Sequence, residues 1–283
     1  MSVPGIVGVI GGGRMGAGIA QSFAAAGSSV VVVESGAQAA AAAMERVATG
    51  LRRAAERGKV ADPGAVLGRV RTVDAVGGLP ADTGLVVEAV PEDAGLKAAV
   101  LAAAEAVVGE GAVLATNTSS LPVTELAASL KHPGRFLGMH FFNPVPASEL
   151  VELVTGPETS PDTVEAARGW TRALGKTDVT VRDSPGFASS RLGVMLGLEA
   201  IRMVEEGVAA PADIDNAMTL GYKHPMGPLR LTDLVGLDVR LAIAEHLAAT
   251  LGDRFAPPAL LREKVARGEL GRKTGRGFYD WDN

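Results

Sequence analysis

The sequence contains no cysteine among its 283 residues. This absence excludes a disulfide framework, a thiolate zinc site and a cysteine nucleophile, and it fits a reducing cytoplasm, where we expect the protein to be. No apolar run approaches the roughly 18 residues that cross a bilayer, and the Met-Ser-Val-Pro start lacks the basic region of a signal peptide. We therefore expect no membrane partner and no export.

The chain also lacks an excess of positive charge, because its formal net charge is -5. This balance argues against a nucleic-acid surface, and no nucleic-acid partner is predicted. Aromatic residues make up only 4% of the chain, yet 47% of it is hydrophobic, which is enough for a large core. The length predicts one large or two smaller globular domains.

The first 33 residues read as a complete strand, turn, helix and strand. The β-branched run 6–10 predicts a strand, and residues 11–16 predict a turn. A helix is predicted over 17–26, where Gly27 ends it, and a second strand over 30–33. Further apolar runs at 85–87, 113–115 and 136–139 are typical of buried parallel strands, with helical stretches between them. The pattern predicts an α/β fold with a doubly wound sheet.

After residue 183 the pattern changes, because 187–207 reads as one long helix and no further strand run follows. Its polar residues fall close to one stripe, so other helices or a second subunit should cover the rest. We predict two domains: 1–183, a Rossmann-type doubly wound sheet domain, and 184–283, a mainly helical C-terminal domain.

The turn after the first strand has the spacing Gly-x-Gly-x-x-Gly of a dinucleotide site. Its glycines permit a tight turn, a close approach of the backbone to a pyrophosphate, and close packing of helix and strand. Glu34 follows the second strand, where a carboxylate accepts hydrogen bonds from ribose hydroxyls and repels a 2′-phosphate. The alternative is a glycine turn with a solvated acid. We favour an NAD site whose loop comprises Gly11, Gly13, Arg14, Met15 and Gly16.

Two strand ends carry chemically useful side chains. The stretch 116–120 includes Ser119, and the stretch 140–144 begins with His140. Working groups of open α/β sheets lie beyond the carboxyl ends of the strands, so both side chains should face one crevice. The other three histidines lie in helix-terminal or surface-like contexts, which makes His140 the predicted general base.

Glu152 lies in the apolar stretch 150–154, where an unpaired carboxylate would be costly to bury. A bond to one imidazole nitrogen would fix the tautomer of His140 and stabilise its charged form. The alternative is an edge-strand glutamate that faces water.

Motifs along the whole chain resemble the L-3-hydroxyacyl-CoA dehydrogenase family in its short, monofunctional 3-hydroxybutyryl-CoA dehydrogenase form. They read "VGVIGGGRMGAGIAQ", "VVEAVPED", "ATNTSSL", "HFFNPV", "SPGF", "AIRMVEEG", "HPMGPL" and "GRKTGRGFYDW". The resemblance implies a cytoplasmic, dimeric, NAD-dependent oxidoreductase of fatty acid metabolism and β-oxidation chemistry. Its partner would be a small-molecule acyl-CoA, and no metal is implied. Domain 1–183 would bind NAD, and domain 184–283 would serve substrate binding and dimerisation.

The resemblance also implies roles for single residues. His140 would remove the hydroxyl proton as hydride leaves C3, with Glu152 as its orienting partner. Ser119 would bind the substrate oxygen near the nicotinamide ribose. The further NAD contacts implied are Asn143, Glu92, Lys97 and Lys273. Without the family, these last residues would read as ordinary solvated polar groups.

A basic helical stretch could hold the phosphates of CoA. Arg53 and Arg57 lie four residues apart and so on one face of that helix, although a solvated helix face explains its cations almost equally well. In the family a serine and a lysine hold CoA here, and the aligned positions are Gly50 and Arg57. The resemblance implies that the phosphate contact survives and the serine contact does not.

Ser190 departs from the family, which has an asparagine that donates to the substrate's 3-oxygen at this position. Three interpretations follow. Ser190 still polarises the carbonyl; or its smaller size admits a branched, hydroxylated or dicarboxylic acyl chain; or the chain is a non-catalytic, crystallin-like NADH-binding protein. A dehydrogenase of a free hydroxy acid or carnitine-like alcohol is a further alternative, and it would not need the basic helix.

Overall fold

The computed structural model describes residues 2–282, and the chain divides after Ser184 into two compact units. We call residues 2–184 the first unit and residues 185–282 the second unit.

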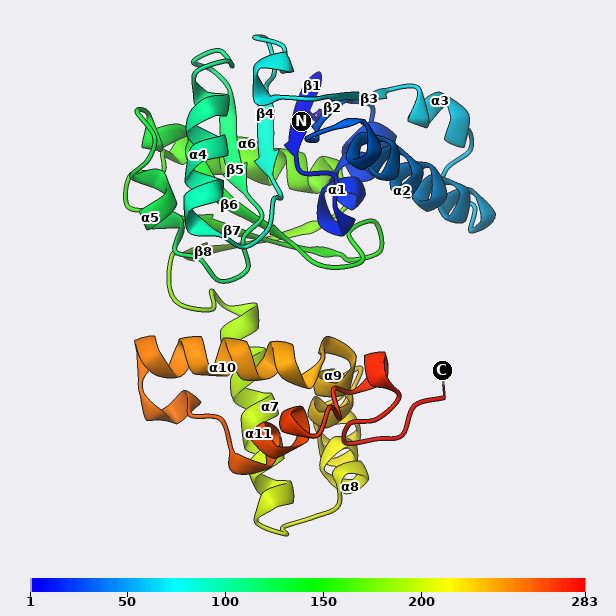
Figure 1. Cartoon of the computed structure of the whole chain (residues 1–283), viewed down its shortest axis with the longest axis vertical. Helices are drawn as coiled ribbons and strands as arrows, with labels where there is room; N and C mark the ends of the chain where they lie inside the picture. Colours follow the sequence, from blue (N-terminus) through cyan, green and yellow to red (C-terminus); the bar gives the residue numbers. More distant parts are fainter. Residues whose placement is uncertain (1, 283) are drawn as a thin grey trace. The chain divides into compact units, whose positions relative to one another are not determined.

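The first unit is an eight-stranded sheet with helices on both faces (Figure 1). Its strands are β1 (Ile6–Ile10), β2 (Ser29–Val33), β3 (Val70–Val73), β4 (Leu85–Glu88), β5 (Val113–Thr116), β6 (Phe136–Phe141), β7 (Leu150–Thr155) and β8 (Thr177–Arg182). Its helices are α1 (Arg14–Ala25), α2 (Ala37–Glu56), α3 (Pro63–Leu67), α4 (Ala94–Glu105), α5 (Val123–Ala127) and α6 (Pro161–Ala173).

The strand order is β3-β2-β1-β4-β5-β6-β7-β8, and β1 pairs in parallel with both β2 and β4. The chain therefore winds outward in two directions from β1, which leaves a crevice beyond the carboxyl ends of β1 and β4. The predicted strands in this part of the chain lie in the parallel ladder. The predicted doubly wound α/β fold is confirmed.

The two outermost strands of the sheet were not predicted. β3 and β8 lie at opposite ends of the strand order, and both are only partly buried along their length. A strand at an edge needs no continuous apolar run, so polar residues such as Arg71 and Asp178 interrupt the pattern. β7 also departs from the parallel pattern, because it runs antiparallel to β6.

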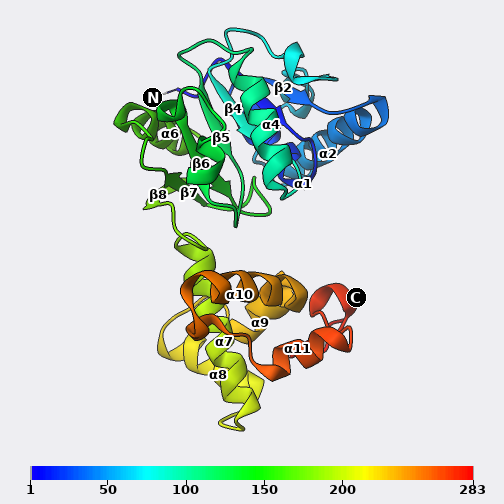
Figure 2. The same ribbon diagram turned by 60° about the vertical axis from the view of Figure 1, so that its left-hand side comes forward.

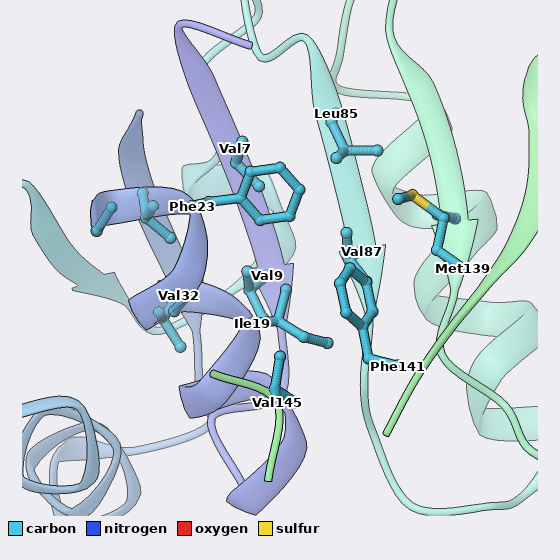
Figure 3. Close-up of a cluster of buried hydrophobic side chains, with 14 of the residues drawn as sticks. Val7, Val9, Ile19, Phe23, Val32, Leu85, Val87, Met139, Phe141 and Val145 are labelled. Atoms are coloured by element: carbon cyan, nitrogen blue, oxygen red, sulfur yellow. The ribbon is translucent and has the colours of Figure 1, made fainter. Parts of the chain in front are cut away.

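Part of the hydrophobic core of the first unit lies between the sheet and α1. Figure 3 shows Phe23 and Ile19 of α1 beside Val7 and Val9 of β1, and all four are fully buried. Burial of these side chains holds α1 against the strand it follows, because removing apolar surface from water is the main favourable term in folding. The packing fixes the start of α1 at the carboxyl end of β1.

The second unit is mainly helical, as predicted. Its helices are α7 (Ser189–Glu205), α8 (Pro211–Asn216), α9 (Pro228–Val235), α10 (Leu237–Leu251) and α11 (Ala259–Ala266). α7 lies in the middle, with α8, α10 and α11 around it (Figure 2). Within residues 2–282, no helix has the length and apolar composition to cross a membrane.

Candidate active site

The glycine turn passes into α1 earlier than predicted. The helix begins at Arg14 and not at residue 17, so Gly16 lies in its first turn. An ideal Cβ on Gly16 would lie 1.8 Å from the carbonyl oxygen of Gly11, and Gly11 itself has a φ of +95°. Only glycine fits both positions without strain. The third glycine of the motif therefore lets the helix start directly on the loop.

The start of α1 fits a dinucleotide pyrophosphate. Gly13 is the N-cap residue, and no described side chain caps the helix there, so its first amides can serve an anion. A Cβ on Gly13 would meet no atom of the described chain within 4 Å. The space above Gly13 is open, which is what a close approach of a pyrophosphate requires.

Glu34 lies directly beside the glycine loop. Its Oε1 accepts a hydrogen bond of 2.6 Å from the Gly12 amide, which ties the end of β2 to the loop. A Cβ on Gly12 would lie 2.4 Å from the Cβ of Ala43, so α2 closes on the loop from the other side. These contacts fix the Glu34 carboxylate beside the loop, and its role toward a ribose stays a prediction.

His140 and Glu152 form a pair across two strands. His140 lies within β6 and not after it, because the antiparallel partner β7 extends the strand to Phe141. His140 and Glu152 are direct partners in that ladder, so their side chains leave the same face of the sheet. Nδ1 of His140 lies 2.8 Å from Oε2 of Glu152.

The surroundings of this pair are largely dry. Glu152 is 1% exposed and His140 is 7% exposed, and the Phe142 ring lies 4.4 Å from the imidazole, centroid to centroid. β7 lies between β6 and β8, so the alternative of an edge-strand glutamate facing water is wrong. A carboxylate only accepts, so Nδ1 carries the hydrogen and donates it to Glu152. This bond leaves Nε2 as the ring nitrogen suited to proton exchange.

A cavity of about 340 Å³ opens at these strand ends. Six residues of the predicted site line it: Met15, Glu92, Lys97, Ser119, His140 and Asn143. The structure thus brings the predicted imidazole and the predicted hydroxyl to the same cavity. It also places the first turn of α1 there, through Met15.

Glu92 organises the loop after β5. It accepts hydrogen bonds from the Thr118 hydroxyl, from the Ser119 amide at 3.0 Å, and from the Ser120 hydroxyl at 2.9 Å. Burial alone would raise the pKa of Glu92, but these bonds and the charge of Lys97 outweigh burial and lower the pKa below its ordinary value of 4.5. Glu92 therefore stays charged and holds Ser119 in place.

A pH-dependent stability difference follows from this lowered pKa. The stabilisation by Glu92 is complete above pH 4.5, its ordinary pKa, and is lost as pH falls through the lowered value. Glu92→Gln should lower the melting temperature at pH 7, and the difference from wild type should shrink as pH falls below 4.5. Differential scanning fluorimetry measures both, with the exposed Glu110→Gln as control. A difference that grows in acid would contradict this assignment.

Lys97 is a buried cation, so its alternative interpretation as ordinary solvated charge is wrong. It is 1% exposed, and its Nζ lies 2.7 Å from Oε1 of the fully buried Glu88. Glu88 also accepts a hydrogen bond of 2.6 Å from Thr116. Nζ lies 3.2 Å from Oε2 of Glu92. Lys97 therefore links the buried end of β4 to the cavity wall.

Asn117 was missed as a site residue. It follows β5 directly, lines the cavity, and its Oδ1 accepts a hydrogen bond of 2.9 Å from the Phe141 amide. This bond joins the ends of β5 and β6 where their parallel pairing stops. The sequence feature that could have identified Asn117 as a site residue is its place in the polar stretch 116–120.

Comparison with known proteins assigns the family. Residues 6–184 match the model of the 3-hydroxyacyl-CoA dehydrogenase NAD-binding domain, and residues 186–281 match the C-terminal domain of the same family. The chain belongs to the 3-hydroxyacyl-CoA dehydrogenase family. The resemblance predicted from the sequence motifs is thereby confirmed.

Relatives of the chain match over almost its whole length. A probable 3-hydroxybutyryl-CoA dehydrogenase from Deinococcus radiodurans is 44% identical over 97% of this chain and 99% of its own. The crystal structure of (S)-3-hydroxybutyryl-CoA dehydrogenase PaaH1 from Ralstonia eutropha has a TM-score of 0.93, 42% identity and full coverage of both chains. FadB2 of M. tuberculosis has a TM-score of 0.92 with the same identity and coverage.

Two predicted site residues of this family member belong to the second unit. Ser190 is half-buried in the first turn of α7. Lys273 forms an ion pair with Asp238 of α10. The predicted contact of Lys273 with the cofactor stays a prediction.

The predicted CoA-binding arginines lie exposed at the end of α2. Arg53 is in the last turn of that helix, and Arg57 follows it as the C-cap residue. At Gly50, where the family has a serine, an ideal Cβ would lie 2.1 Å from Oε1 of Gln21, so the end of the Gln21 side chain would have to move to admit one.

Proposed function

We propose that the chain is an NAD-dependent dehydrogenase that interconverts 3-hydroxyacyl-CoA and 3-oxoacyl-CoA, with 3-hydroxybutyryl-CoA and acetoacetyl-CoA as a representative short-chain pair. The observation that carries this proposal is the His140–Glu152 pair, whose imidazole lines a cavity together with Ser119 and with Met15 of the glycine motif. Oxidation of NADH in the presence of acetoacetyl-CoA, with free acetoacetate as the control, tests it.

His140 is proposed as the general base. Nδ1 donates to Glu152, so Nε2 takes the hydroxyl proton of the substrate, and the buried carboxylate stabilises the imidazolium that forms. NAD, when bound, supplies the acceptor for the hydride that leaves C3. The O–H and C3–H bonds break and the C3–O single bond becomes a carbonyl. In the reverse direction His140 returns the proton to the oxygen.

Ser119 is proposed to bind the 3-oxygen of the substrate. Its amide donates to Glu92, which positions the residue at the rim of the cavity that His140 lines. A hydroxyl donor there stabilises the negative charge that gathers on the oxygen during reduction. Ser190 is proposed as a second, shorter donor in place of the family asparagine.

The cofactor contacts are proposals on the same basis. The amides of the loop and Arg14 would face the pyrophosphate, and Glu34 would accept from the ribose hydroxyls and so favour NAD over NADP. Glu92, Lys97 and Asn143 line the cavity, and we propose that the nicotinamide binds on their side of it. Lys273 is proposed as a further cofactor contact, and its Nζ forms an ion pair with Asp238.

The double substitution Arg53→Ala and Arg57→Ala should raise KM for acetoacetyl-CoA by roughly 3- to 30-fold, since two exposed ion pairs contribute about 0.3–1 kcal/mol each. The affinity for NADH should not change. Steady-state kinetics at low and high salt measure the effect, which should shrink at high salt because exposed charges are screened. Exposed Arg71→Ala is the control. An unchanged KM would remove CoA binding from this helix.

Two predictions about the setting of the protein remain proposals. We place it in the cytoplasm as a homodimer, with the first unit binding NAD and the second unit supplying substrate and subunit contacts. The second unit exposes the apolar side chains of Leu220 and Tyr222, at 68% and 76%. Exposed apolar residues of this size are common at subunit interfaces.

A further inference from the structure

A buried lysine holds the loop that joins β6 to β7. We call residues 142–149 the β6–β7 loop. Lys176 lies between α6 and β8 and is 8% exposed. Its Nζ donates a hydrogen bond of 2.6 Å to the Val145 carbonyl and a second bond to the Ser148 carbonyl. The ammonium therefore fixes two backbone groups of the same loop.

The surroundings of Lys176 are costly for a cation. Burial lowers the pKa of Lys176 below its ordinary value of 10.5, although the nearby charge of Glu149 acts in the opposite direction. A methionine of similar length would fill the same space without burying a charge. What the lysine adds is the pair of hydrogen bonds to the β6–β7 loop.

A second contact holds the β6–β7 loop against α1, the helix that follows the glycine loop. Val145 is 2% exposed and lies in the hydrophobic core near Ile19 of α1 (Figure 3). An ideal Cβ on Gly18 would lie 2.9 Å from the Cβ of Val145, so helix and loop are in close contact there. The side chain of Val145 thus contacts α1 while its carbonyl accepts a hydrogen bond from Lys176.

The β6–β7 loop carries a residue of the candidate active site. Asn143 lines the cavity and lies two residues before Val145. Its side chain is exposed and makes no hydrogen bond with any residue from 2 to 282. Because no such bond holds the side chain, the backbone of the loop sets the position of Asn143.

We propose that Lys176 is a positioning residue for the cofactor, which fixes the β6–β7 loop so that Asn143 stays at the cavity wall and can bind NAD. This inference rests on the proposed function, in which Asn143 contacts NAD. Lys176 itself touches neither cofactor nor substrate in this proposal, because its ammonium donates to the loop. A group that acts in this way should affect cofactor binding more than the chemical step.

Lys176→Met tests this split between binding and chemistry. It should raise the dissociation constant for NADH by roughly 3- to 10-fold, the effect of one lost hydrogen bond to the cofactor. A fluorescence titration with NADH measures it. At saturating NADH, kcat should fall far less than the roughly 10²-fold that loss of a general base costs, because the ladder of β6 and β7 still holds His140 beside Glu152.

A double-mutant cycle shows whether Lys176 acts through Asn143. Asn143→Ala alone should weaken NADH binding by a similar factor, and adding Lys176→Met should then cause little further loss. Two factors that multiply would mean that Lys176 acts independently of Asn143, and they would overturn the inference. Lys176→Gln can still donate to the loop and should give a smaller loss, and it replaces Lys176→Met in the cycle if that variant does not fold.

Arg135 provides a matched control. It also donates to two carbonyls of one loop, those of Gly109 at 2.6 Å and Ala112 at 3.4 Å. That loop precedes β5, so it lies at the end of the strand away from the cavity. Arg135→Met should lower the melting temperature and leave the affinity for NADH unchanged. An equal loss of affinity in Arg135→Met would mean a general loss of stability and would overturn the inference.

The outcomes distinguish this inference from the proposed function. Turnover of acetoacetyl-CoA by wild type, with an unchanged NADH affinity in Lys176→Met, would overturn the inference and leave the reaction standing. An unchanged affinity in Asn143→Ala would contradict both the inference and the proposed contact of Asn143 with NAD. Absence of turnover with every 3-oxoacyl-CoA would contradict the proposed reaction alone, because the titration with NADH needs no substrate.

Discussion

Replacing His140 by alanine is expected to lower kcat for the reduction of acetoacetyl-CoA by on the order of 10³-fold, because general acid–base catalysis contributes about 10²- to 10⁴-fold. The substitution leaves Glu152 buried without its imidazole partner. It does not touch the glycine loop, so the affinity for NADH should remain near that of wild type. Single-turnover kinetics and a fluorescence titration with NADH measure the two quantities.

His246→Ala provides the matched control for this experiment. His246 lies on α10 and is only partly buried, so removing its imidazole should not change kcat. General acid–base catalysis contributes at least about 10²-fold to the rate. If His140→Ala kept more than about a tenth of wild-type kcat, the loss would be too small for a general base, and His140 would not be the base. Loss of NADH binding would instead indicate a structural role.

Lys97→Met is expected to give the largest loss of stability, about 3–5 kcal/mol, because it leaves one charge of a buried pair without its partner. Glu88 is fully buried and would keep only its bonds to Thr116 and the Val90 amide. Urea unfolding followed by circular dichroism measures the shift in the unfolding midpoint. NADH binding should weaken as well, since Lys97 lines the cavity.

A second substitution tests the physical reason for that loss. Adding Glu88→Leu to Lys97→Met removes the unpaired carboxylate, and the double variant should recover much of the lost stability. Arg52→Met is the control, because its ion pair with Glu45 is exposed and should contribute about 0–1 kcal/mol. If Lys97→Met lowered the free energy of unfolding no more than Arg52→Met does, Lys97 and Glu88 would not be a tightly coupled buried pair.

The central strands could be predicted from the sequence because burial on both faces demands continuous apolar runs. The glycine loop could be predicted because its three glycines have a fixed spacing. The start of α1 could not, since the helix begins inside the motif and depends on the contact of Gly16 with Gly11. β3 and β8 lacked an apolar run because the ends of the sheet are partly exposed.

The site could be predicted in part. A histidine near a strand end and a glutamate in an apolar stretch both indicated catalysis, but their pairing depends on the antiparallel register of β6 and β7. Register is set by contacts between distant segments, which a single sequence does not show. Buried cations are harder still. Lys97 reads as a solvated charge in the sequence, and only the packing of its helix shows that it is buried.

The rate of NADH oxidation by the purified protein with acetoacetyl-CoA tests the central claim most directly. Free acetoacetate and NADPH are the two controls. Turnover that requires the CoA ester and prefers NADH over NADPH is the predicted result, and it would assign the reaction to this chain. NADH binding without turnover of any 3-oxoacyl-CoA would contradict the proposed reaction and leave a protein that binds the cofactor without catalysing this step.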